Sequence, residues 1–236
     1  MPTRRQIVRI FAPAALALAA LAAWMFFRAG RVRESRFVFG AMGTRAACTF
    51  YTSDPETAES AFAAVKREFD RVTKACNLYD PESELSRLNR EAGKDFFVCS
   101  ELLWRILAEA RRAHAASSGA FDVTVKPLMD LRGFYRTRNE LPSPEELAEA
   151  LTRVGLDKLE WDDARRAVRF KLPGMALDLG GIAKGYALDL AAAAVRELGV
   201  ALINGDGVPA DPAEGMKLLQ AAAANGDVIA RQLLTR

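Results

Sequence analysis

The segment from Asp178 to Gly185 carries the residue types that a phosphate site needs. It reads Asp-Leu-Gly-Gly-Ile-Ala-Lys-Gly, and a helix is expected to begin at its paired glycines. Gly180 and Gly181 permit positive φ and a close approach by a ligand. Backbone N–H groups at a helix start favour an anion, and Lys184 adds a mobile cation. The segment therefore predicts a phosphate- or nucleotide-binding turn, and a tight turn that serves packing alone is the alternative.

A second polar segment runs from Ser118 to Leu128, where a helix is expected to end. Alternation along an extended chain would place Asp122 and Thr124 on one face. Such side chains could hold a sugar or amide edge of a ligand. The alternative, which these residue types favour when taken alone, is that both satisfy backbone groups of a turn.

Capping residues and apolar side chains at helical spacing predict the helices that would carry these segments. Asp54-Pro55 and Ser143-Pro144 have the pattern of helix starts, and Ser100 caps a further helix. Gly199 is expected to end the Ala-rich helix that follows the paired glycines. The predicted helices cover residues 55–76, 84–89, 101–116, 144–154 and 183–198, with a last pair beginning at residue 212.

Short or alternating apolar runs predict the strands. They cover residues 37–50, 158–161, 167–172, 175–179 and 200–203, and the second and third form a hairpin. Strands and helices interleave without strict alternation, which favours an α+β fold over a doubly wound one. We expect a mixed sheet flanked by helices, an N-terminal transmembrane helix and a short C-terminal helical pair.

The first 36 residues carry a net positive charge, whereas the rest of the chain is slightly acidic. They contain seven arginines and one glutamate, so the +3 chain has a body of net −3. A slightly acidic body is a poor binder of a phosphate backbone, which excludes nucleic acid as the default partner. Arginines precede an apolar stretch of 18 residues, Ile10–Phe27, which is long enough to span a bilayer. We expect an uncleaved anchor in a bacterial inner membrane with the body facing the periplasm; a cleaved signal peptide is the alternative.

The cysteine and histidine content excludes common metal motifs. Three cysteines without C-x-x-C spacing do not form a zinc ribbon, and a single histidine, His114, cannot form an H-E-x-x-H site. Cys76 lies on an apolar helical stripe and is expected to be a buried thiol. His114 is expected to be a surface or packing residue.

Four motifs in one order resemble the ApbE family. They are Met-Gly-Thr at 42–44, Tyr-Asp-Pro-Glu-Ser-Glu-Leu-Ser-Arg-Leu-Asn at 79–89, Gly-Ala-Phe-Asp-Val-Thr-Val-Lys-Pro-Leu at 119–128 and Asp-Leu-Gly-Gly-Ile-Ala-Lys-Gly at 178–185. The resemblance implies an FAD:protein FMN transferase. In that reaction FAD is cleaved at its pyrophosphate with the help of Mg²⁺, AMP leaves, and FMN is joined to a Thr or Ser hydroxyl of an acceptor protein.

The resemblance also implies site residues, although it assigns no catalytic one. A flat flavin ring needs apolar and π faces, which the implied partners Met42 and Tyr79 supply. Gly181 would offer its carbonyl to Mg²⁺. The implied FAD-binding residues are Met42, Tyr79, Ala120, Phe121, Asp122, Asp178 and Lys184.

The family pattern stops near Gly205, and the following residues resemble a Sel1-like repeat. We therefore expect a membrane segment at 1–36, an incomplete ApbE-like domain at 37–205 and a Sel1-like helical fragment at 206–236. The segment that the family places next carries the remaining Mg²⁺ ligands, and Mg²⁺ requires about six oxygens. Three functions stay open: a transferase of low turnover, a flavin-binding pseudoenzyme and a membrane-anchored interaction protein.

Overall fold

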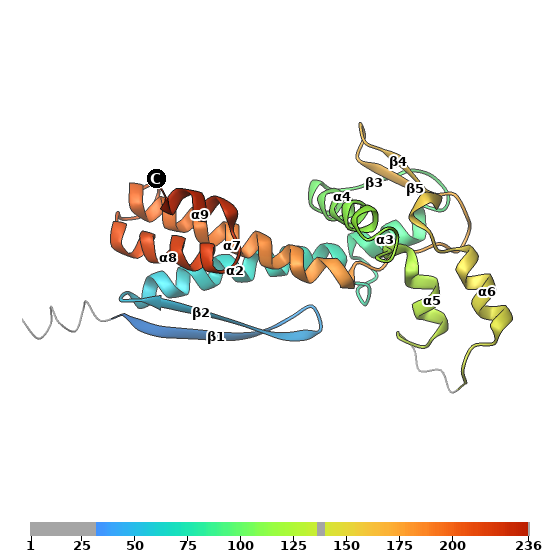
Figure 1. The fold of residues 1–236 in the computed structure, drawn as a ribbon, viewed down its shortest axis with the longest axis horizontal. Helices are drawn as coiled ribbons and strands as arrows, with labels where there is room; N and C mark the ends of the chain where they lie inside the picture. Colours follow the sequence, from blue (N-terminus) through green and yellow to red (C-terminus); the bar gives the residue numbers. More distant parts are fainter. Residues whose placement is uncertain (1–31, 136–139, 236) are drawn as a thin grey trace, which may run out of the picture. The chain divides into compact units, whose positions relative to one another are not determined.

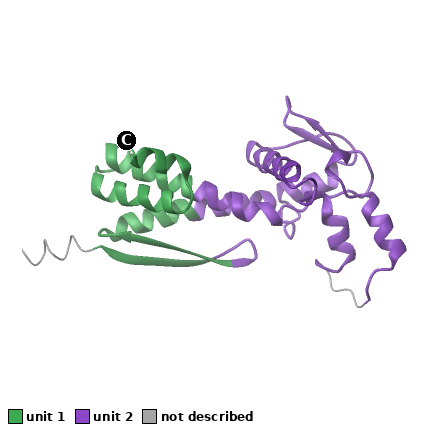
Figure 2. Ribbon diagram, in the orientation of Figure 1, with its two compact units in different colours: residues 1–39, 45–65, 192–236 green, residues 40–44, 66–191 purple. Residues whose placement is uncertain are grey.

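Residues 32–135 and 140–235 are described in the computed structural model. Figure 2 shows that the chain forms two compact units, each assembled from separate stretches of sequence. Unit 1 consists of residues 1–39, 45–65 and 192–236, and unit 2 consists of residues 40–44 and 66–191. The predicted membrane stretch at 10–27 lies outside the described residues. The predicted domain boundaries at 37 and 205 stay predictions.

The described elements confirm an α+β fold (Figure 1). The helices are α2 (Pro55–Cys76), α3 (Glu84–Glu91), α4 (Glu101–Ala116), α5 (Lys126–Leu131), α6 (Pro144–Thr152), α7 (Gly180–Asn204), α8 (Pro212–Ala224) and α9 (Val228–Leu234). Short 3₁₀ turns are η1 (Val123–Val125) and η2 (Leu156–Lys158). The strands are β1 (Arg33–Ala41), β2 (Thr44–Thr52), β3 (Phe97–Val98), β4 (Leu159–Asp162) and β5 (Ala167–Phe170).

The sheets of the described residues are antiparallel, so the prediction of a mixed sheet is wrong. One sheet has the order β3-β5-β4, and both of its ladders are antiparallel. The other is the β1–β2 hairpin, whose two-residue connection requires antiparallel strands. The hairpin predicted around residues 162–166 is confirmed as β4–β5.

The single strand predicted over residues 37–50 is instead part of this β1–β2 hairpin. Its turn is Met42-Gly43, and both residues have positive φ, 50° and 74°. Turns with this geometry match the twist of paired strands, and glycine adopts them at no steric cost. The Met42-Gly43 pair therefore reverses the chain, which a single strand over residues 37–50 does not allow.

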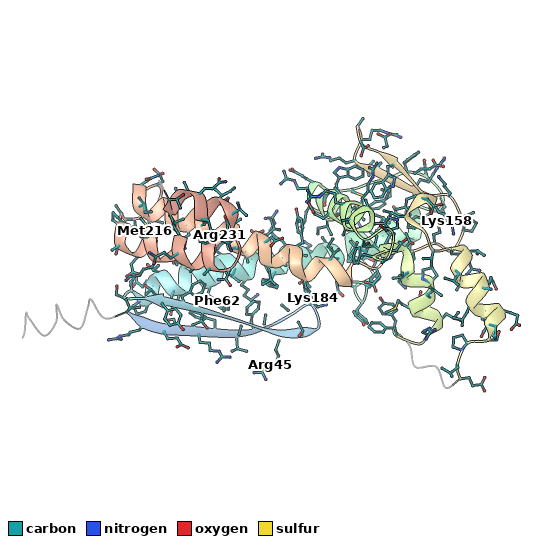
Figure 3. All side chains as sticks on the ribbon, viewed as in Figure 1. Arg45, Phe62, Lys158, Lys184, Met216 and Arg231 are labelled. Atoms are coloured by element: carbon teal, nitrogen blue, oxygen red, sulfur yellow. The ribbon has the colours of Figure 1, made fainter. Side chains whose placement is uncertain are left out.

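In unit 1, aromatic side chains join the hairpin to α2. The ring of Phe37 stacks on Phe62 with centroids 4.4 Å apart, and Phe39 meets the same ring edge-on at 5.5 Å. Figure 3 labels Phe62 on α2. Burial of these rings against one another gives a two-stranded ribbon the apolar support that it lacks alone.

Helix α7 runs through Gly199, which corrects two predictions. Gly199 does not end the helix, and residues 200–203 are helical rather than a strand. Gly199 instead faces Gly215 of α8: a Cβ on Gly199 would lie 2.9 Å from the Gly215 carbonyl oxygen. The glycines therefore permit a close crossing of α7 and α8, and α7 ends before Gly205, whose φ is 76°.

A buried carboxylate ties α8 to the end of β2. Glu214 is 2% exposed and accepts hydrogen bonds from the hydroxyls of Thr52 and Ser53 and from the Ser53 amide at 3.1 Å. Lys217 completes the cluster at 2.6 Å. Burial of Glu214 opposes its ionisation, yet these donors hold its pKa low, at about 2. The C-terminal helical pair predicted from residue 212 is confirmed as α8 and α9.

Unit 2 has an apolar core between its short helices and the three-stranded sheet. Side chains that are fully buried include Leu85, Leu88, Leu103, Ile106, Leu107 and Val168. The predicted caps are confirmed: Ser100 accepts from the Leu103 amide, and Ser143 forms a capping box with Glu146. These local signals fix where α4 and α6 begin.

Residues 175–179 form no strand, contrary to the prediction. The side chain of Asn89 bonds both backbone groups of Leu177, donating at 3.0 Å and accepting at 2.8 Å, and the Asp178 amide donates to Val123 at 2.8 Å. One side chain thus replaces a neighbouring strand as the backbone's partner. This arrangement holds Asp178 immediately before α7.

Within residues 32–135 and 140–235, no helix combines the length and the apolar character that crossing a bilayer requires.

Candidate functional site

A cavity of about 510 Å³ lies in unit 2 at the start of α7. Its size falls in the range of small-molecule and cofactor sites. Three segments singled out from the sequence meet there: the β1–β2 turn, the chain around Tyr79, and the glycine turn before α7. The lining residues are Met42, Gly43, Thr73, Cys76, Asn77, Leu78, Tyr79, Met129, Phe134, Tyr135, Asp178, Gly180, Gly181 and Lys184.

The start of α7 provides the polar end of the cavity. The Gly180 amide donates to Asp178 Oδ1 at 2.7 Å, and the Tyr135 hydroxyl donates to Asp178 Oδ2. Lys184, labelled in Figure 3, is exposed, and its Nζ lies 3.4 Å from the Gly180 carbonyl oxygen. The structure gives Lys184 no ion pair with a described carboxylate, so its ammonium group is available to an anion at the helix start.

Met42 stands in an uncommon backbone conformation at the cavity edge. Its φ of 50° is a left-handed value that non-glycine residues seldom adopt outside tight turns. The turn presents the flexible, polarisable thioether to the cavity beside Gly43. Such an edge suits the face of a planar ligand.

Two tyrosines, Tyr79 and Tyr135, also line the cavity. Tyr79 is 74% exposed, and its ring meets Tyr135 edge-on with centroids 6.0 Å apart. Burial, followed by the hydrogen bond to Asp178, raises the pKa of Tyr135, so its hydroxyl stays protonated and donates. Both tyrosines also line a neighbouring cavity of about 600 Å³, together with Leu78, Lys126 and Asp130.

The three predicted binding residues at 120–122 do not line the 510 Å³ cavity. Asp122 caps η1: it accepts from the Thr124 amide at 2.8 Å and from the Leu156 amide at 3.1 Å. The extended run expected there is wrong, and the turn-stabilising alternative is confirmed. Phe121 lies beside the site, because a Cβ on Gly181 would approach its ring to 3.1 Å.

The environments of the cysteines and of His114 indicate packing roles rather than reactive ones. Cys48, Cys76 and Cys99 are free thiols, and burial raises the pKa of Cys76 to about 12. Cys76 therefore lines the cavity as a protonated, weakly reactive group. His114 Nδ1 lies 2.9 Å from the Phe121 carbonyl oxygen and 3.5 Å from Asp122, as a packing role predicts.

Sequence reasoning missed four contributors: Met129, Phe134, Tyr135 and Asn89. The first three line the cavity, and Asn89 holds the backbone next to Asp178. The sequence Gly-Phe-Tyr at 133–135, within a polar region, could have indicated Phe134 and Tyr135. Large aromatic side chains in loops commonly contact ligands. Asn89 ends the family motif at 79–89, but the motif could not show its role, because its partner is 88 residues away.

The described residues do not compose a magnesium site. They contain no cluster of three or more Asp, Glu, His or Cys groups that could hold a metal ion. Both oxygens of Asp178 already accept hydrogen bonds, and Gly181 lies in the first turn of α7, where carbonyls serve the helix. Mg²⁺ needs about six oxygens in octahedral array, which these groups do not supply.

Comparison with known proteins gives the family of the chain. The model of the ApbE family matches residues 42–207. This range covers the three segments that line the cavity. The chain belongs to the ApbE family.

Curated relatives of this ApbE protein carry one description. It is 33% identical to an "FAD:protein FMN transferase" of Haemophilus influenzae over 60% of this chain and 42% of the relative. It is 30% identical to the protein of the same description from Vibrio cholerae over 64% of this chain and 46% of the relative. The chain thus spans less than half the length of these two relatives.

Solved ApbE structures share the fold. The flavin transferase ApbE from Vibrio cholerae aligns with a TM-score of 0.65 and 27% identity over 71% of this chain and 55% of that one. The ApbE protein from Thermotoga maritima aligns with a TM-score of 0.64 and 28% identity over 70% and 53%. These alignments support an α+β fold of the ApbE type for this chain.

Proposed function

We propose that this chain binds FAD in the cavity of unit 2 and takes part in the transfer of FMN from FAD to a Thr or Ser hydroxyl of an acceptor protein, with release of AMP. The observation that carries the proposal is the meeting of the Met42 turn, Tyr79 and the start of α7 around one cavity. Relatives of the chain are described as FAD:protein FMN transferases.

The two ends of the cavity match the two ends of a flavin mononucleotide. Met42 and Tyr79 offer apolar and aromatic surface to the ring system. The positive end of the α7 dipole and the Lys184 ammonium offer positive potential to the phosphate. Charge that builds on a transferring phosphoryl group would meet Lys184.

Mg²⁺ enters the proposal only as a requirement of the full reaction. The metal would neutralise phosphate charge. Because the described residues lack the oxygen ligands for it, we assign this chain no metal-dependent step. FAD binding is therefore the part of the reaction that its own residues support.

Flavin titration tests the binding proposal. The full chain is mixed with FAD, and flavin fluorescence is followed with Lys184→Met and the exposed-lysine control Lys94→Met. We expect saturable quenching by wild type and Lys94→Met, with weaker binding by Lys184→Met. Absence of saturable binding by folded wild-type protein would overturn the proposal.

A transfer assay separates a transferase from a pseudoenzyme. The full chain is incubated with FAD, Mg²⁺ and an acceptor domain that has a Thr or Ser flavinylation site. We expect very slow appearance of covalent FMN and of AMP, because the described residues do not form the metal site. Turnover as fast as that of a full-length family member would contradict this expectation.

We further propose that residues 1–36 anchor the chain in a bacterial inner membrane with its body in the periplasm. The support is the apolar stretch Ile10–Phe27 between groups of arginines. Fractionation with a C-terminal reporter tests it: resistance to carbonate extraction and accessibility from the periplasm are expected. Extraction into the soluble fraction would contradict an uncleaved anchor.

As a second candidate function, we propose that residues 206–236 form a Sel1-like fragment that acts as a protein-interaction module. Exposed Val228, Ile229 and Leu233 on α9 favour it. Crosslinking from position 229 in cells tests it, since a specific adduct is expected. Position 94, which is also exposed, is the control site. The same nonspecific adducts from positions 229 and 94 would contradict the proposal.

A further inference from the structure

Tyr135 lines the cavity and also makes a hydrogen bond to the Asp178 carboxylate. Its hydroxyl donates to Asp178 Oδ2, and the second oxygen of that carboxylate accepts from the Gly180 amide at 2.7 Å. The two donors come from the segment after α5 and from α7. Asp178 is therefore held from both sides.

The Asp178 carboxylate lies at the start of α7, where it would repel the phosphate of a ligand. Its Oδ1 lies so close to the start of α7 that a Cβ on Gly180 would approach it to 3.1 Å. The positive end of a helix is the place that attracts an anion, and two anions there repel each other. A free Asp178 carboxylate would thus compete with a ligand phosphate for α7 and for Lys184.

Tyr135 is itself well anchored. Its ring meets Tyr79 at 6.0 Å and Phe134 at 5.3 Å between centroids, and Lys126 Nζ lies 4.8 Å from its centre. Lys126 is fixed in turn by Asp130 at 2.7 Å. These contacts keep the hydroxyl directed at Asp178 without help from a ligand.

We propose that Tyr135 is a positioning residue that makes the cavity selective for phosphate-bearing flavins. Its hydroxyl and the Gly180 amide together occupy both oxygens of Asp178, which keeps the carboxylate from pairing with Lys184 and leaves that ammonium group to the phosphate. This inference rests on the proposed flavin site. It assigns Tyr135 a role through Asp178 rather than through contact with the ring.

The ratio of FMN affinity to riboflavin affinity tests the inference. Riboflavin has the same ring and no phosphate, so a loss of stacking or of folding lowers both affinities and leaves the ratio unchanged. We expect Tyr135→Phe to lower the ratio about tenfold, the effect of one hydrogen bond to a charged group. The matched control Tyr51→Phe, at an exposed tyrosine of β2, should leave it unchanged.

The charge of Asp178 is tested by a second substitution. In Tyr135→Phe/Asp178→Asn the repelling carboxylate is gone, so the FMN-to-riboflavin ratio should return to the wild-type value or exceed it. An unchanged ratio in Tyr135→Phe, or a ratio that stays low in the double variant, overturns the inference while the flavin site stands. Binding of neither flavin by folded wild-type protein overturns both.

Discussion

At the residue scale, the start of α7 brings opposite charges into one small region. Lys184 and the positive end of the helix dipole attract an anion, whereas Asp178 repels one. The hydrogen bonds from Tyr135 and Gly180 occupy the carboxylate and leave the lysine without a described acidic partner. If FAD binds as we propose, this arrangement leaves Lys184 to the phosphate.

Lys184→Met should weaken FMN binding about tenfold, because it removes a charge-assisted contact with the phosphate. Riboflavin binding should change less than twofold. The difference between the two flavins should shrink in high salt, since salt screens exposed charges. Equal losses for both flavins in calorimetric titrations would show that Lys184 does not act on the phosphate.

At the element scale, the close crossing of α7 and α8 depends on paired glycines. A Cβ on Gly199 would lie 2.9 Å from a backbone oxygen of Gly215, and backbone cannot move aside as a side chain can. Both helices belong to unit 1 at this point. The crossing therefore holds the C-terminal helices in the fold of unit 1.

Gly199→Ala should destabilise the chain by about 1–3 kcal/mol, the usual cost of overpacking. Gly185→Ala is the matched control in the same helix, because nothing lies within 4 Å of its added Cβ. This control should be neutral or stabilise by up to about 1 kcal/mol through helix propensity. Urea unfolding of both variants checks the prediction, and equal stabilities would contradict the crossing.

The elements also show what sequence can predict. Ser100 and Ser143 are predictable as caps because a cap and its amide lie three residues apart. Gly199 was misread as a helix stop, because its role depends on Gly215, which the local pattern does not contain. Residues 175–179 were misread as a strand, because an apolar run does not reveal that Asn89 replaces the neighbouring strand.

The candidate site also contains residues that the sequence could predict and residues that it could not. Met42, Tyr79 and Lys184 line the cavity as the family motifs implied. Tyr135 could not be predicted, because its hydroxyl meets Asp178 across 43 residues. Asp122 was predicted to contact FAD, and the structure shows it bonded to backbone amides. Motifs identify segments, and the fold decides which side chains in them line the cavity.

At the scale of the whole molecule, stability should depend on pH through Glu214. Its pKa of about 2 in the folded chain lies below its ordinary value of 4.5. A carboxylate whose pKa is lower in the folded chain than in the unfolded chain stabilises the folded state at pH values above the unfolded-chain pKa. This stabilisation is lost as the pH falls toward and through the folded-chain pKa. The buried carboxylate therefore links acid stability to the docking of α8 in unit 1.

Wild-type protein should lose about 3 kcal/mol between pH 5 and pH 2 through this group. Glu214→Gln should be less stable at pH 7, because buried donors lose a charged acceptor, and should show a flatter pH dependence. Urea unfolding at several pH values measures both. Parallel curves for the two proteins would mean that Glu214 does not carry the acid sensitivity.

The proposed function depends on the claim that FAD binds in the cavity of unit 2. Hydrogen–deuterium exchange of the full chain with and without saturating FAD tests it most directly, because it locates the ligand without a substitution. Slower exchange is expected in residues 42–44, 77–79 and 178–184, and unchanged exchange in α9. Protection confined to other segments, or none at all with FAD bound, would contradict the claim.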